Sequence, residues 1–139
     1  MVAELAAEKP LLCYPIGEAD SDPEMLMTFV ATIVIPNPEA SAFDQRRSQA
    51  MIQLFALNEW EDLQRDRKRM LLLLAPYLER KTASSASQLD LAVIEACLSG
   101  KQAHTACCRA FERLWASDPA QARAIWEACK ASMIDAPQL

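Results

Sequence analysis

The amino-acid sequence predicts an all-α protein, a single-domain helical bundle of about five to six helices joined by short turns. The first observation is that 139 residues contain only two glycines, whereas about 7% is usual, so few tight hairpins are expected. The second is that Asp or Asn repeatedly precedes Pro, and apolar residues follow at helical spacing. Hydrophobic residues make up 52% of the chain and charged residues 24%, a composition that supports a globular core.

The first element is expected to be a buried helix over 23–35. The sequence "DPE" at 22–24 provides its start, and Pro36 provides its stop. The uncharged run at 25–35 has eleven residues, too few for a bilayer span of roughly 18 to 20. The alternative is a lone strand at 28–35, where six of eight residues are β-branched. Because no second strand is evident, such a strand would pair across a dimer or onto a partner.

The remaining helices have start signals of their own. Asn37 and Asp118 each precede a proline, which is typical of an N-cap followed by the first helical residue. Asn58 and Ser87 each precede an acidic residue by three positions, as in a capping box. These signals predict helices over 38–57, 59–80, 88–98, 101–116 and 119–134.

Several residues within this pattern have specific expected roles. Trp60 begins the apolar stripe of the 59–80 helix and is expected in the core. Pro76 is expected to kink that helix or end it early, and Gly100 is expected to end the 88–98 helix as a C-cap. Residues 82–87 are expected to be a flexible connection, and residues 1–22 a loop-rich acidic segment.

The net charge of −5 is concentrated in the first third of the chain. Residues 1–43 contain one lysine and seven acidic residues, whereas residues 44–81 contain eight basic and six acidic residues. Because nucleic-acid-binding surfaces are normally basic, the acidic first third favours a basic protein partner or the chain's own basic middle. No export signal is evident and the five cysteines are an odd number, so we expect reduced thiols and a cytoplasmic protein.

Basic residues of the second and third predicted helices are the candidates for partner binding. Arg67 and Arg47 interrupt the apolar stripes of their helices. An arginine on such a row must be paired, extend to solvent or face an interface, and we expect Arg67→Glu to weaken partner binding without lowering the melting temperature. The alternative for the basic face is a solvated, ion-paired surface. The candidate residues are Arg46, Arg47, Arg65, Arg67, Lys68 and Arg69.

One histidine and the cysteines around it are the candidates for chemistry. His104 and Cys108 lie four residues apart on one helical face, and both are zinc-ligand types. Their spacing matches no closed zinc site, and Cys107 and Cys129 fall on apolar stripes, so we expect buried thiols, no metal and no cofactor. A nucleophilic Cys108 would need a group that orients His104 and a set of oxyanion donors, and neither can be identified. We therefore expect that the chain is not an enzyme.

The segment "CCRAFERLWASDPAQARAIWEACK", residues 107–130, resembles a helix-turn-helix DNA-binding motif. Ala110 stands at the small position of the first helix, Ser117 in the turn, and "PAQARAIW" as the recognition helix. Trp115 departs from the motif at the usual turn glycine, and residues 88–139 hold five basic and six acidic residues. The segment also resembles a tetratricopeptide-type helix pair, without a companion repeat, which implies a tightly packed pair of helices.

These observations favour a small acidic cytoplasmic protein that binds another protein. It would act as an inhibitor, such as an immunity protein, an antitoxin or a phage-type inhibitor of a host complex, or as an adaptor, by steric and electrostatic docking. The alternative is a helix-turn-helix DNA-binding regulator that uses residues 101–134. A homodimer is left open, and no membrane contact is expected.

Overall fold

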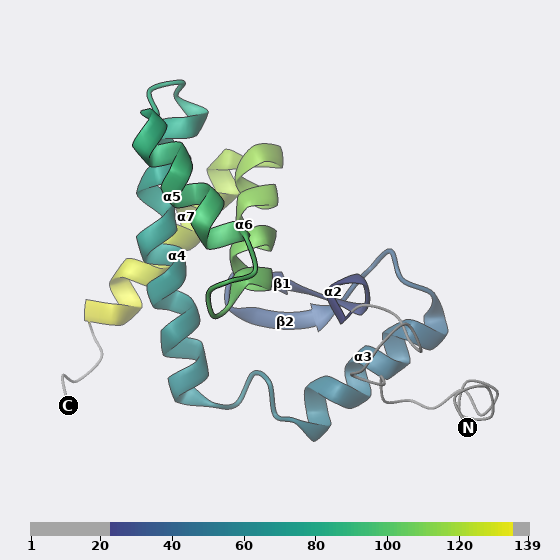
Figure 1. The fold of residues 1–139 in the computed structure, drawn as a ribbon. Coiled ribbons are helices and arrows are strands. Elements are labelled where there is room, and N and C mark those ends of the chain that lie inside the picture. Colours follow the sequence, from purple (N-terminus) through teal and green to yellow (C-terminus); the bar gives the residue numbers. More distant parts are fainter. Residues whose placement is uncertain (1–22, 135–139) are drawn as a thin grey trace.

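The computed structural model describes residues 23–134, which form six helices and one two-stranded antiparallel sheet (Figure 1). The predicted all-α helical bundle is confirmed. The predicted loop-rich segment 1–22 lies outside the described residues. The elements are α2 (Pro23–Leu26), β1 (Met27–Val30), β2 (Ile33–Pro36), α3 (Ala42–Leu54), α4 (Glu61–Thr82), α5 (Gln88–Leu98), α6 (Thr105–Ser117) and α7 (Pro119–Ile134).

Helices α4 to α7 pack against one another and enclose the main hydrophobic core (Figure 1). Trp115 of α6 lies at its centre, where its ring meets that of Phe111 edge-on at a centroid distance of 5.5 Å and that of Trp126 at 5.9 Å. Such ring pairs add about 0.5–1.5 kcal/mol each beyond the burial of their area. Pro76 lies inside α4, which continues to Thr82, so this proline does not end the helix early.

Helices α5 and α7 have the predicted boundaries because their capping residues act as expected. Ser87 Oγ accepts a hydrogen bond from the Asp90 N–H (3.1 Å), and the Asp90 carboxylate accepts one from the Ser87 N–H (2.9 Å), which completes a capping box. Asp118 accepts a hydrogen bond from the Gln121 N–H at the start of α7 (3.1 Å). Gly100 follows α5 with φ of 87°, a conformation that glycine adopts without strain.

The segment 23–35, predicted as a buried helix, instead forms one helical turn followed by a β-hairpin. The alternative, a lone strand at 28–35, is nearer to the structure. However, the segment forms two strands that pair with each other, so it does not need a strand from another chain. The two-residue loop begins with Ala31 at φ 54°, a left-handed conformation that costs a non-glycine residue about 1–2 kcal/mol. The turn contains neither glycine nor asparagine, so the usual sequence signal of a two-residue hairpin is absent. The paired residues are Met27 with Pro36, Thr28 with Ile35, Phe29 with Val34 and Val30 with Ile33.

A second, smaller core joins the hairpin to α3. Leu26, Val34, Met51 and Ile52 are buried, and α3 lies against β2. The Ser48 hydroxyl of α3 donates a buried hydrogen bond to the Leu26 carbonyl at 2.6 Å. Figure 1 shows α3 apart from α4–α7, with the hairpin between them. The hairpin therefore connects α3 to the rest of the bundle.

Helix α3 begins later than predicted because Asn37 serves the hairpin instead of a helix. The Asn37 backbone N–H donates to the Leu26 carbonyl (2.8 Å), and its side-chain amide donates to the Met25 carbonyl (3.0 Å). Ser41 is the N-cap of α3, and its hydroxyl oxygen accepts a hydrogen bond from the Asp44 N–H (3.1 Å). A serine at this position is a preferred cap.

The two faces of the hairpin have different surroundings. Phe29 packs against the main core and Val34 is buried. Val30 and Ile33, paired across the strands on the opposite face, are both exposed. The folded chain therefore presents β-branched apolar side chains to solvent.

Candidate interaction surface

Arg67 is inside the molecule, although the sequence suggested it as an interface residue. It is 4% exposed, and its Nη1 donates to the carbonyls of Thr32 and Leu57, each at 2.9 Å. Its guanidinium lies over the Phe29 ring, 5.2 Å from the centroid. Burial lowers the pKa of Arg67, and the nearby Cys107 thiol opposes that shift. The burial corrects the interface interpretation: Arg67 ties α4 to the hairpin turn and to the α3–α4 loop.

Arg47 is also buried, in α3. Its Nη1 lies 3.4 Å from Asp44 Oδ1, and its guanidinium is 5.6 Å from the centroid of the Phe43 ring. Positions three residues apart share one helical face, so Arg47 contacts acidic and aromatic neighbours of its own helix. Its burial leaves little of the side chain for a partner to contact, and partner binding by Arg47 stays a prediction.

The other four basic candidates do not form one basic patch. Arg65 pairs with Asp62 at 2.7 Å, and Arg69 pairs at 3.4 Å with the acidic residue three positions before it. Arg46 lies on another helix, and Lys68 is half-buried. Exposed ion pairs contribute about 0.2–1 kcal/mol each. The structure thus favours the ion-paired surface for α4, and partner binding by these four residues stays a prediction.

A different surface has the character of a binding site. Leu54, Phe55 and Trp60 lie at the end of α3 and in the loop to α4, and their exposed fractions are 63%, 56% and 63%. The Trp60 Nε1–H donates to the Phe55 carbonyl at 3.3 Å, which holds the indole against the loop. These three residues are called the aromatic corner. Neighbouring large apolar side chains exposed in this way are typical of interaction sites.

The loop that carries the aromatic corner is fixed to the hairpin. The Asn58 side chain accepts a hydrogen bond from the Val34 N–H (2.8 Å) and donates one to the Val34 carbonyl (2.9 Å). Asn58, predicted as a helix cap, therefore pairs with the edge of β2 much as another strand would. Arg67 binds Thr32 and Leu57 in the same region. Thr32, just before Ile33, is bonded to Arg67 of α4, and Val34, just after it, is bonded to Asn58 of the loop. We define the docking surface as the aromatic corner with the exposed hairpin residues Val30 and Ile33.

Acidic side chains flank Trp60. Glu59 and Glu61 are exposed, and within residues 23–134 no ion pair involves either side chain. Asp62, one residue further, is paired with Arg65. The surroundings of the indole therefore have a local excess of negative charge.

Sequence reasoning missed this surface. It placed Trp60 on the core-facing stripe of the 59–80 helix, but α4 begins at Glu61 and Trp60 is only its N-cap. The indole therefore lies outside the periodicity that suggested burial. Leu54 and Phe55 were not selected, because a single exposed apolar residue carries no signal in a sequence. The one available signal is a Leu-Phe pair and a Trp in a short, acidic inter-helix segment.

The cysteines within residues 23–134 lie in the bundle core, as predicted for buried thiols, and Cys13 lies outside the described residues. Cys97, Cys107, Cys108 and Cys129 are all buried and free. Burial raises the pKa of Cys107 to about 12 and that of Cys108 to about 11, so both thiols are protonated at neutral pH and poor nucleophiles.

His104 and Cys108, the weak metal candidates, are not joined by further ligands. His104 is the N-cap residue of α6, at φ 63°. Within residues 23–134 no three His, Cys, Asp or Glu side chains gather closely enough to hold a metal ion.

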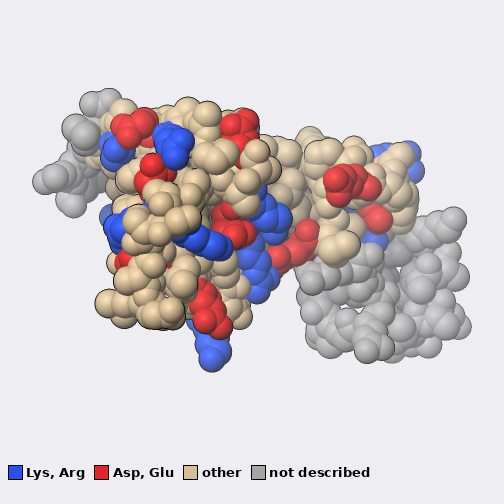
Figure 2. Space-filling view, turned by 90° about the horizontal axis from the view of Figure 1, so that it is seen from above, with Lys and Arg blue, Asp and Glu red and all other residues tan. Residues whose placement is uncertain are grey.

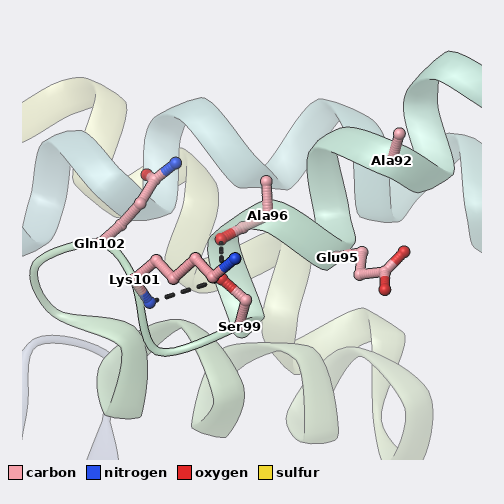
Figure 3. A pocket seen from close by; sticks show the side chains of 6 residues that line it. All are labelled: Ala92, Glu95, Ala96, Ser99, Lys101 and Gln102. Carbon is pink, nitrogen blue, oxygen red and sulfur yellow. Dashed lines mark hydrogen bonds between the residues drawn. The ribbon is translucent and has the colours of Figure 1, made fainter.

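A groove of about 340 Å³ runs along the C-terminal part of α5 (Figure 3). Ser99 Oγ donates to the Ala96 carbonyl (3.0 Å) and accepts from the Lys101 N–H (3.4 Å), so these groups complete the end of the helix. In Figure 3 the Glu95 carboxylate extends away from Lys101. The groove does not direct titratable side chains to a common point. Its lining residues are Ala92, Glu95, Ala96, Ser99, Lys101 and Gln102.

Helices α6 and α7, the site of the helix-turn-helix resemblance, pack against each other. The cations of α7 are engaged, because Arg123 pairs with Glu79 of α4 at 2.9 Å and Lys130 pairs with Glu127 at 2.6 Å. Figure 2 shows basic and acidic side chains interspersed over the face that it presents. Phosphate binding depends on a local excess of basic groups, and no observation on these helices favours it.

No protein-family model, curated protein or solved structure matches the chain. Across residues 23–134, no helix has both the length and the apolar character that crossing a bilayer requires. A functional conclusion therefore has to come from the docking surface itself.

Proposed function

We propose that the chain binds another protein through the docking surface, in the cytoplasm, as an inhibitor or adaptor and not as an enzyme. The observation that carries the proposal is the exposure of Trp60, at 63%, beside exposed Leu54 and Phe55. Tryptophan and phenylalanine are enriched at protein interfaces, and tryptophan is prominent among the few residues that supply most of the binding energy.

The fold itself gains little from Trp60. It occupies the N-cap of α4 without a side-chain cap, a position where Ser, Thr, Asp or Asn would stabilise the helix by about 1 kcal/mol more. Its ring is mostly in water. A large aromatic residue at a position where a small polar one would be more stable supports a functional role.

The surface is also ordered in advance. Asn58 and Arg67 fix the loop to the hairpin through hydrogen bonds of 2.8 to 2.9 Å. Ordering a loop during association reduces affinity, so a loop that is already fixed can bind more tightly. Such preorganisation supports a dedicated binding surface in preference to an incidental apolar patch.

The proposed mechanism is steric. A partner bound at the docking surface would lie beside the bundle of α4–α7, which would cover neighbouring parts of the partner. The acidic first third of the chain, with one lysine against seven acidic residues, would speed the encounter with a basic partner. Inhibition and adaptor function both follow from this mode of binding.

Site-specific photo-crosslinking in the cell of origin tests the proposal. We expect Leu54→p-benzoylphenylalanine, which leaves Trp60 in place, to form one dominant covalent adduct with a protein. Leu89, 74% exposed on α5, is the matched control, and the same crosslinker there should not give that adduct. No adduct at position 54, or an equal yield of the same adduct at position 89, would contradict the proposed function.

A further inference from the structure

We infer that the partner presents an arginine side chain to Trp60, with an apolar surface beside it for Leu54 and Phe55. This inference rests on the proposed function and specifies the chemistry of the partner at the docking surface. It depends on two observations, the orientation of the indole and the charges next to it.

The indole offers a ring face to a partner in preference to a hydrogen-bond donor. Its only donor, Nε1–H, is already bonded to the Phe55 carbonyl at 3.3 Å. The ring is otherwise exposed, and the face of an indole attracts cations more strongly than the faces of the other aromatic side chains. A guanidinium is planar and weakly hydrated, so it stacks on such a ring better than an ammonium group does.

The charges near the ring also favour a cation. Glu59 and Glu61, on either side of Trp60, have no ion-pair partner within residues 23–134, and together they contribute two negative charges. The N-terminus of α4 opposes them with a dipole equivalent to roughly half a positive charge. The Asp62–Arg65 pair is close to neutral. The carboxylates therefore outweigh the dipole, and the net negative charge next to Trp60 favours a cationic group on the partner.

The apolar part of the surface requires a matching apolar contact on the partner. Leu54 and Phe55 are exposed at the end of α3, where the Phe55 carbonyl holds the indole, and Val30 and Ile33 of the hairpin are two further exposed apolar side chains. A free arginine would leave these side chains in water. The occupant is therefore an arginine on a protein surface with apolar neighbours, and neither a free amino acid nor an isolated basic tail.

Selection from a random dodecapeptide library tests the inference with the full chain as bait. We expect enriched peptides that contain arginine next to an apolar residue. Their binding should weaken about 30-fold in Trp60→Ala, a loss typical of an interface hot spot. It should weaken about threefold or more in Glu59→Gln/Glu61→Gln at low salt, and less at high salt.

Matched controls and contrary outcomes separate the two proposals. Leu89→Ala and Glu95→Gln change exposed residues of α5 and should leave peptide binding unchanged. Enriched peptides without arginine, or binding that the Glu59→Gln/Glu61→Gln variant retains at low salt, would overturn the inferred arginine while leaving a protein-binding function in place. Binding unaffected by Trp60→Ala, or no enrichment over the Trp60→Ala bait, would overturn the docking surface itself.

Discussion

At the residue scale, Arg67 is one of two buried arginines in residues 23–134. Its guanidinium is buried, its hydrogen bonds go to two carbonyls, and its Nε has no partner among these residues. Hydrogen bonds from a charged donor contribute about 1.5–3 kcal/mol each, and the cost of removing the charge from water offsets part of that. The Arg67 side chain therefore holds α4 against the hairpin turn and the α3–α4 loop.

Substitution of Arg67 should destabilise the fold, contrary to the sequence-based expectation for Arg67→Glu. Arg67→Met leaves two carbonyls without donors, and we expect a loss of about 1–3 kcal/mol in the free energy of unfolding. Arg67→Glu adds a buried, uncompensated negative charge beside those oxygens, and we expect a loss of at least about 3 kcal/mol.

Urea denaturation followed by circular dichroism measures both losses. Arg65→Met is the control, because the Arg65 side chain is 44% exposed and surface changes usually stay within about 0.5 kcal/mol. If Arg67→Glu were as stable as the unmodified chain, Arg67 would not be buried in solution.

At the scale of elements, the turn of the hairpin stores strain that can be measured. Ala31 adopts φ 54°, which glycine tolerates and alanine does not. We expect Ala31→Gly to raise the free energy of unfolding by about 0.5–1 kcal/mol, because relief of strain exceeds the added entropy of the unfolded chain. Ala92→Gly, at an exposed position of α5, should lower it by about 1 kcal/mol. Destabilisation by Ala31→Gly in the same denaturation experiment would argue against the left-handed turn.

The junction of α4 and α5 should make stability depend on pH in the acidic range. The hydrogen bonds from Arg80, at 2.9 and 3.1 Å, and the Ser87 N–H lower the pKa of Asp90 to about 2. The stabilisation is complete above the unfolded pKa near 4 and is lost as pH falls towards about 2.

Comparison with Asp90→Asn isolates this effect. We expect the variant to melt at a lower temperature at neutral pH, and the difference to shrink between pH of about 4 and about 2. Glu95→Gln, without an ion pair within residues 23–134, should melt like the unmodified chain throughout. A constant difference for Asp90→Asn down to the lowest pH would show that Arg80 does not hold this carboxylate.

The elements that sequence reasoning predicted well are those with local signals. Ser87, Asp90 and Asp118 act within three residues of their own position, so α5 and α7 could be located closely. The hairpin and the start of α3 depend on tertiary contacts instead. An asparagine side chain can bond backbone groups at a helix N-cap or, as Asn37 and Asn58 do, next to a hairpin. The sequence alone could not distinguish these two roles.

At the scale of the whole molecule, stability and binding are assigned to different parts. The bundle of α4–α7 holds the main core, while the hairpin, the end of α3 and the α3–α4 loop carry the exposed residues of the docking surface. Figure 1 shows the hairpin between α3 and the bundle. Arg67 connects these two parts, and Arg109 of α6 joins the bundle to α2, because it bonds the Leu98 carbonyl and the Glu24 carboxylate. Sequence reasoning proposed a protein-binding function, but two of the arginines that it selected are buried. Periodicity shows that an arginine lies on an apolar row of its helix. It does not show whether the chain itself supplies acceptors for the guanidinium there.

The most direct test of the central claim is the affinity of the full chain for the protein that crosslinks at position 54, measured by titration calorimetry. The account predicts that Trp60→Ala weakens this affinity about 30-fold with an unchanged melting temperature, while Leu89→Ala binds normally. Equal affinity of the unmodified chain and Trp60→Ala would contradict the docking surface.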